Sequence, residues 1–110
     1  MIDWNDFSKV DMRVGTIIEA EVFEEVKKPA LKIKVDFGPE IGIKKTSAQI
    51  RALYEPKDII GKQVIGVVNF PPKQIASIMS EVLLLGALGD GQDVILLTTD
   101  KPVKNGLPVS

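Results

Sequence analysis

The sequence contains no cysteine and no histidine among its 110 residues. Without cysteine, the chain can form no disulfide and offers no thiolate metal ligand or thiol nucleophile. Without histidine, it lacks the commonest general base and the commonest metal ligand of proteins. The carboxylates of Asp36, Glu40 and Glu81 have no motif-spaced partner that could activate them. We therefore expect no catalytic residues, no metal and no cofactor.

Long apolar runs are also missing. No charge-free apolar run approaches the roughly 20 residues needed to cross a bilayer. The first six residues, M-I-D-W-N-D, have neither the basic start nor the apolar centre of a signal peptide. The sequence therefore predicts a cytoplasmic protein without membrane insertion, and its length fits one domain over residues 1–110.

The net charge of −1 hides an uneven distribution. Residues 1–26 carry seven acids against two bases, residues 27–73 carry ten bases against four acids, and residues 74–110 carry four acids against two bases. Only the middle segment is suited to a polyanion. The alternative is that its lysines form an ordinary solvated face, because a sequence pI near 5.4 is far from that of a dedicated nucleic-acid binder.

Hydrophobic periodicity predicts five strands. Strict alternation indicates a long strand over 12–23, in which Met12 and Ile18 share one face and Gly15 marks a bend or bulge. Further strands are expected over 31–36, 41–46, 64–70 and 82–88, and the G-D-G-Q segment at 89–92 is the strongest turn signal. Two helices are expected, one at the N-terminus capped by Asp3 and one over 48–54 capped by Ser47 and ended by Pro56.

This order predicts the all-β class: a five-stranded OB-fold barrel with a short N-terminal helix and a short helix between the third and fourth strands. The runs 82–88 and 94–97 are apolar on both faces, so their outer faces need cover and a homodimer is expected. Trp4 either packs on the barrel or belongs to the subunit interface. The candidate interface residues are Trp4, Phe7, Leu84, Leu88 and Leu97.

The polar insert between the last two strands is the first place to look for function. Its apolar side chains either close one end of the barrel or bind polypeptide. The helical spacing of Ile75, Ile78 and Met79 places these three side chains on one side of a short turn. The candidate peptide-binding residues are Phe70, Pro72, Ile75, Ile78 and Met79.

The same region offers a nucleic-acid interface. Basic side chains would contact phosphates, polar groups of the insert would read base edges, and Phe37 and Tyr54 are either stacking platforms or core residues. The candidate nucleic-acid-binding residues are Arg13, Lys44, Lys45, Asn69, Lys73, Ser80 and Glu81, with Lys32 and Lys34 as further phosphate ligands.

Several motifs match known proteins. The segment N-F-P-P-K-Q-I-A-S-I-M-S-E-V-L-L-L-G-A (69–87) resembles the tRNA-binding OB domains appended to some methionyl- and phenylalanyl-tRNA synthetases. The whole chain also resembles the CsaA-type export-related chaperones of that family, through D-M-R-V-G-T-I (11–17), D-F-G (36–38), E-I-G-I-K-K-T-S-A-Q-I (40–50), V-N-F-P-P (68–72) and S-E-V-L-L-L-G (80–86).

The resemblance implies a dimeric OB-fold protein that holds non-native or preprotein polypeptides without ATP, beside the export motor. Its alternative is tRNA binding, for which Asn69, Lys73, Ser80 and Leu85 occupy matching positions. The tRNA-binding family tends to carry a basic residue at Ala76, a glycine at Val82 and a methionine at Leu83. These three departures favour the chaperone.

Overall fold

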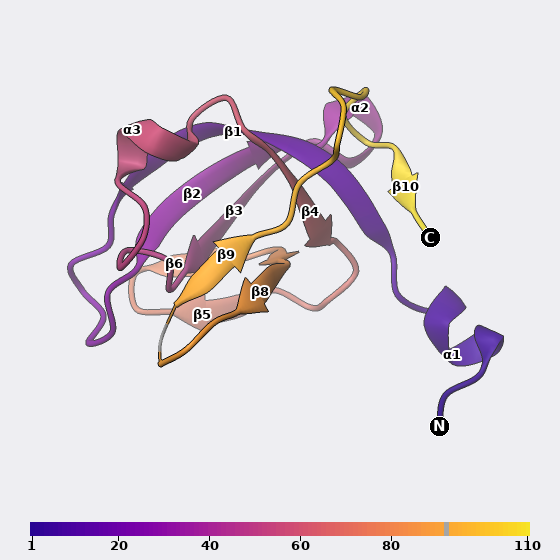
Figure 1. Ribbon diagram of the computed structural model, residues 1–110, viewed down its shortest axis with the longest axis horizontal. Coiled ribbons are helices and arrows are strands. Elements are labelled where there is room, and N and C mark those ends of the chain that lie inside the picture. The colour runs from indigo at the N-terminus through magenta and orange to yellow at the C-terminus, as the bar shows by residue number, and fades with distance from the viewer. Residues whose placement is uncertain (92) are drawn as a thin grey trace.

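The structure, a computed structural model that describes residues 1–91 and 93–110, is a nearly closed antiparallel β-barrel with three short helices in that part of the chain (Figure 1). Its main sheet has the strand order β3-β2-β1-β4-β7, and β10 pairs with β1. The bounds are β1 Met12–Val22, β2 Leu31–Asp36, β3 Ile43–Ala48, β4 Gln63–Val67, β7 Leu83–Leu84 and β10 Pro108–Val109. The predicted all-β class and OB-like five-stranded barrel are confirmed.

Strand β1 is bulged, which changes the face that simple alternation predicts. The register between β1 and β2 shifts between Ile17 and Glu19. Gly15 and Ile17 face the core before the extra residue and Ala20 packs against the core after it, while Ile18, predicted to share the face of Met12, is 39% exposed. The predicted inward face of this strand was therefore wrong at Ile18.

The bulge does not lie at Gly15, where the sequence suggested it. A Cβ on Gly15 would lie 2.6 Å from Val35 Cγ1 and 2.7 Å from the ring of Phe37. On β4, a Cβ on Gly66 would lie 2.9 Å from the same ring. Both glycines let the backbone approach Phe37, which is fully buried in the core and cannot act as a stacking platform.

The remaining core comes from inward positions of all the main strands. In β2, the predicted alternation is confirmed, since Leu31, Ile33 and Val35 are at most 2% exposed. Tyr54 packs against this core, and its hydroxyl accepts a hydrogen bond from the backbone N–H of Leu96 at 3.1 Å. Tyr54 therefore contributes to the core as well.

The connections on either side of β3 differ from the prediction. Helix α2 (Gly38–Ile41) occupies the start of the predicted third strand, so β3 runs two residues later than expected. Residues 51–53 form a turn within the helix predicted over 48–54, and the helix before β4 is α3 (Pro56–Ile59). Pro56 begins this helix instead of ending one, because proline needs no hydrogen-bond acceptor in a first helical turn.

The apolar run predicted as one strand over 82–88 is divided. Strand β7 pairs with β4, whereas β8 (Gly86–Leu88) turns away to form a separate hairpin with β9 (Val94–Leu96). Gly89 and Gly91 lie in the predicted turn between them, and Gln92 lies outside the described residues. The strand predicted over 64–70 ends at Val67.

Helix α1 (Trp4–Ser8) begins at its predicted cap. The Asp3 carboxylate accepts a hydrogen bond from the backbone N–H of Asp6 at 2.9 Å, and the Asp6 carboxylate accepts one from Asp3 at 3.1 Å. The helix projects from the barrel near the C-terminus (Figure 1). Trp4 is 85% exposed and packs edge-on against Phe7, so it does not cover the barrel.

Candidate functional site

The insert between β4 and β7 is a β-hairpin, with β5 (Lys73–Ile75) paired to β6 (Ile78–Ser80). Its tip is strained, because Ala76 has a φ of 48°, a region that non-glycine residues rarely adopt. The Ala76 carbonyl accepts a hydrogen bond from Gln74 Nε2 at 2.6 Å, and Ser77 Oγ donates one to Glu25 Oε1 at 2.5 Å. The hairpin tip is therefore tied to the loop between β1 and β2.

The base of the hairpin is fixed to β3. The backbone N–H of Glu81 donates to the carbonyl of Lys45 at 2.8 Å, and the backbone N–H of Lys45 donates to Glu81 Oε1 at 2.9 Å. Thr46 Oγ1 donates to the carbonyl of Val82 at 2.7 Å and lies 3.0 Å from Ser80 Oγ. These contacts close the barrel between β3 and the segment that enters β7.

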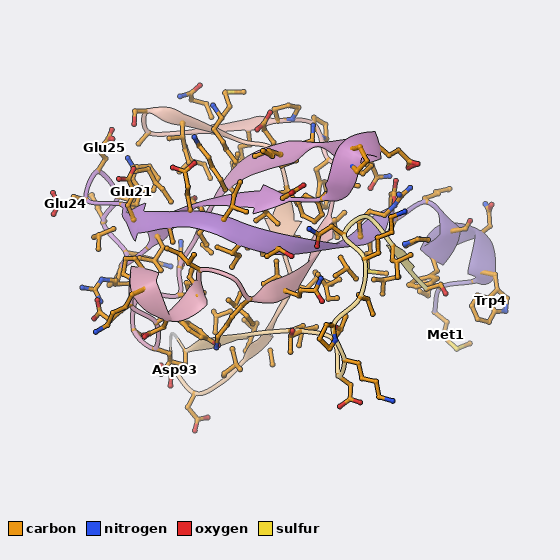
Figure 2. All side chains as sticks on the ribbon, turned by 90° about the horizontal axis from the view of Figure 1, so that it is seen from above. Met1, Trp4, Glu21, Glu24, Glu25 and Asp93 are labelled. Carbon is orange, nitrogen blue, oxygen red and sulfur yellow. The ribbon has the colours of Figure 1, made fainter. Side chains whose placement is uncertain are left out.

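A cavity of ≈ 230 Å³ lies between this hairpin and the sheet. Its lining combines cross-strand acids and bases of β1 and β2 with residues of β3 and one apolar side chain of β6. The lining residues are Glu19, Ala20, Glu21, Lys32, Ile33, Lys34, Lys45, Thr46 and Ile78. Figure 2 places Glu21, Glu24 and Glu25 at the end of the molecule opposite Trp4, so this part of the surface lies far from helix α1.

The predicted peptide-binding residues are distributed along the hairpin. Ile75 pairs directly with Ile78, so these two side chains share one face, while Met79 lies on the other. The helical spacing assumed for the three residues was therefore wrong. Phe70 is 55% and Met79 39% exposed, Pro72 is exposed, and Ile75 and Ile78 are half-buried. The hairpin thus carries apolar surface on both of its faces.

Two of the predicted nucleic-acid residues hold the fold together. Arg13 forms ion pairs with Asp11 at 2.7 Å and Glu40 at 2.9 Å. Its hydrogen bonds, first to Asp11 and then to Glu40, raise the pKa of the Arg13 guanidinium above its ordinary value. The Asn69 side chain accepts from the backbone N–H of Asp11 at 3.0 Å and donates to the carbonyl of Lys9 at 2.7 Å. A phosphate or base would have to displace these partners.

The remaining predicted nucleic-acid residues lie around the hairpin. Ser80 and Glu81 are occupied by the contacts with β3 described above. Lys44 and Lys45 are neighbours on β3 and point to opposite faces, while Lys73 is exposed opposite Ser80. Within residues 1–91 and 93–110, Lys44, Lys45 and Lys73 form no ion pair.

The predicted dimer residues fall into two groups. Trp4, Leu88 and Leu97 are exposed, at 85%, 83% and 42% respectively. Phe7 is half-buried on α1, and Leu84 packs partly against the barrel core. Helix α1 also borders a cavity of ≈ 490 Å³ between its own side chains, the start of β1 and β10. Leu84 and Leu88 belong to β7 and β8 and Leu97 follows β9, so the five predicted interface residues come from two different regions of the chain, and the interface stays a prediction.

The described part of the chain holds no group of three or more carboxylate side chains placed to bind a metal ion. Among the helices that the structure describes, none has the length and apolar character to cross a membrane.

Sequence reasoning missed how the lysines of β2 are paired. Lys32 Nζ lies 3.0 Å from Glu21 Oε1, and Lys34 Nζ lies 3.2 Å from Glu19 Oε2. The signal was present in the segments E-A-E (19–21) and K-I-K (32–34), whose charges alternate on the outward faces of neighbouring strands. Pairing them requires the strand register, which depends on the bulge at Ile18.

The family model described as "Putative tRNA binding domain" matches residues 12–108. The chain belongs to this tRNA-binding domain family. The methionine–tRNA ligase of Methanocaldococcus jannaschii is 39% identical over 108 residues, which are 98% of this chain and 16% of the ligase. The chain therefore spans about a sixth of the length of that relative.

Two solved structures of the family are similar over their full length. The chaperone CsaA from Bacillus anthracis str. Ames is 45% identical with a TM-score of 0.95, covering 100% of this chain and 99% of its own. The CsaA chaperone protein from Picrophilus torridus is 51% identical with a TM-score of 0.92, covering 100% of both chains. The resemblance to CsaA-type members of the tRNA-binding domain family is thus confirmed.

Proposed function

We propose that this protein is an ATP-independent chaperone that binds non-native or export-destined polypeptides as a homodimer, without catalysing a reaction. The observation that carries the proposal is the β5–β6 hairpin, which presents apolar side chains on both faces next to a charged cavity. Exposed apolar side chains bind unfolded segments without demanding one sequence, and the flexible thioether of Met79 adapts to different partners.

The CsaA-type relatives support this proposal over RNA binding. Their identities of 45% and 51% extend over whole chains, whereas the ligase match covers one part of a longer protein. In addition, Arg13, Asn69, Ser80 and Glu81 are held in intramolecular contacts. Export and a cytoplasmic location belong to the proposal, and isolating the clients bound in its own cells tests both.

The proposal is tested by aggregation of a thermally unfolded client protein. We expect the wild type to slow aggregation, and Ile78→Ser to slow it less because the substitution removes apolar contact area from the hairpin. Met79→Ser is a second variant at an exposed position, which keeps the test valid if Ile78→Ser loosens the hairpin. Ile60→Ser is the matched control, since Ile60 is 51% exposed but lies outside the hairpin. Equal suppression by all four proteins would exclude the hairpin as the client site.

RNA binding is the second candidate function, favoured by the unpaired side chains of Lys45 and Lys73 beside the hairpin. The affinity of a dedicated tRNA binder falls steeply as salt is added. The logarithm of its binding constant drops by roughly 0.7 to 0.9 per phosphate contact for each tenfold rise in salt concentration. A shallow salt dependence of tRNA binding would therefore argue against this function.

The proposed homodimer uses the end of the molecule that carries α1. Trp4 and Ile2 are 85% and 74% exposed, and neighbouring exposed apolar side chains of this size are typical of protein–protein interfaces. Because this end lies opposite Glu25, which is hydrogen-bonded to the hairpin tip, dimerisation would leave the tip of the hairpin open (Figure 2). Sedimentation of the purified chain at micromolar concentration tests the dimer, and a monomer there would exclude it.

A further inference from the structure

The outer face of β1 and β2 carries two cross-strand ion pairs. Glu19 lies opposite Lys34 and Glu21 lies opposite Lys32 in the strand register. The carboxylate–ammonium distances are 3.2 and 3.0 Å. The ammonium of Lys32 also lies 5.5 Å from the centroid of the Phe23 ring. Each lysine is therefore held on the sheet by its partner instead of extending into solvent.

These pairs determine the charge of the cavity below the hairpin. Five of the residues that line it are charged, three lysines and two glutamates, so their net charge is +1 instead of the +3 of the lysines alone. Of these five residues, Lys45 alone forms no ion pair within the described part of the chain. A phosphate that approaches this face meets one unpaired cation and two carboxylates.

We infer that Glu19 and Glu21 are specificity-determining residues that exclude nucleic-acid phosphates from this face and reserve it for polypeptides. A polyanion could use Lys32 and Lys34 only by displacing their carboxylates, which would then lie beside the phosphates and repel them. A polypeptide segment carries no regular array of negative charge and pays no such penalty. The inference rests on the proposed chaperone function for the identity of the favoured ligand.

The test is the binding of unfractionated tRNA to the full chain carrying Glu19→Gln and Glu21→Gln, measured by fluorescence anisotropy across a salt series. We expect affinity at about 100 mM salt to rise tenfold or more, and the logarithmic salt dependence to steepen by about 1.4 to 1.8, as two new phosphate contacts require. Exposed ion pairs contribute little to stability, so the double variant should fold, as circular dichroism will verify.

Two controls separate this effect from a general change of net charge. Asp90→Asn with Asp100→Asn alters the net charge equally at exposed residues that do not line the cavity, and should leave the salt dependence unchanged. Adding Lys32→Ala and Lys34→Ala to the glutamine variant should abolish the gain. An unchanged affinity in the glutamine variant, or an equal gain in the aspartate control, would overturn the inference.

A parallel aggregation assay distinguishes the two proposals. If the wild type fails to slow aggregation, the chaperone function is wrong whatever the tRNA result. If the wild type slows aggregation but the glutamine variant gains no tRNA affinity, the chaperone function stands and the role of Glu19 and Glu21 is wrong.

Discussion

Replacing Phe37 by alanine should lower the free energy of unfolding by about 3 to 5 kcal/mol, as removal of a fully buried aromatic side chain does. Phe37 is 0% exposed, and its ring lies against Gly15 and Gly66. Because glycines have no side chains that could move into the space, the cavity should remain largely open. Urea unfolding followed by circular dichroism measures the loss.

The matched control is Phe70→Ala, the same change at a side chain that is 55% exposed. Phe70 belongs to the proposed client surface, so this variant should lose client binding while keeping most of its stability. A loss below about 1 kcal/mol for Phe37→Ala would contradict the packing described for the core, since burial of this side chain should contribute more. If the alanine variant does not fold, Phe37→Leu replaces it in the test, because leucine leaves a smaller cavity and should lower the free energy of unfolding by less.

Thr46→Val should cost about 1 to 3 kcal/mol, although the two side chains have nearly the same shape, because a buried acceptor loses its donor. Thr46 is 2% exposed and donates to the carbonyl of Val82, which is itself buried. The substitution also removes the contact with Ser80 at the base of the hairpin. Urea unfolding should show the loss, and hydrogen exchange of residues 78–82 should become faster.

Thr98→Val is the control for this prediction. Thr98 Oγ1 also donates to a backbone carbonyl at 2.7 Å, that of Gln63, but Thr98 is exposed. Water can replace the lost donor there, so the cost should be well below that at Thr46. Equal costs at the two positions would show that burial of the Thr46 hydrogen bond does not determine its contribution.

The sequence predicted the parts of the fold that depend on local pattern. Alternation located β2 and its inward side chains, and Asp3 identified the start of α1. Each of these signals is contained within a few consecutive residues. The five main strands and their OB-like order followed from apolar runs separated by turns. The resemblance then added the family.

What the sequence could not predict depends on contacts between distant segments. The bulge at Ile18 accompanies a hydrogen bond from the backbone N–H of Ile17 to the carbonyl of Lys62, which precedes the neighbouring strand β4 and is distant in the sequence. The apolar run 82–88 divides because Leu85 bonds to Ile65 while Gly86 pairs with Leu96. Neither pairing has a signal in the local residues.

The same limitation applied to the candidate site. Residue type alone suggested that Arg13, Asn69 and Glu81 read nucleic acid, but these groups are equally suited to hydrogen bonds within the fold. Only the structure shows that Asn69 joins the residues before β1 to the end of β4, and that Glu81 closes the barrel against Lys45. Of the predicted lysines and apolar hairpin residues, Lys45, Lys73 and Met79 are exposed, and Lys44, Ile75 and Ile78 are half-buried.

The most direct measurement of the central claim is hydrogen–deuterium exchange of the full chain with and without a reduced, unfolded client protein. If the β5–β6 hairpin binds clients, exchange of residues 70–81 should slow when the client is present, while residues 56–62 around α3 should exchange at an unchanged rate. If the client slows exchange elsewhere and leaves residues 70–81 unaffected, the hairpin is not the polypeptide-binding site.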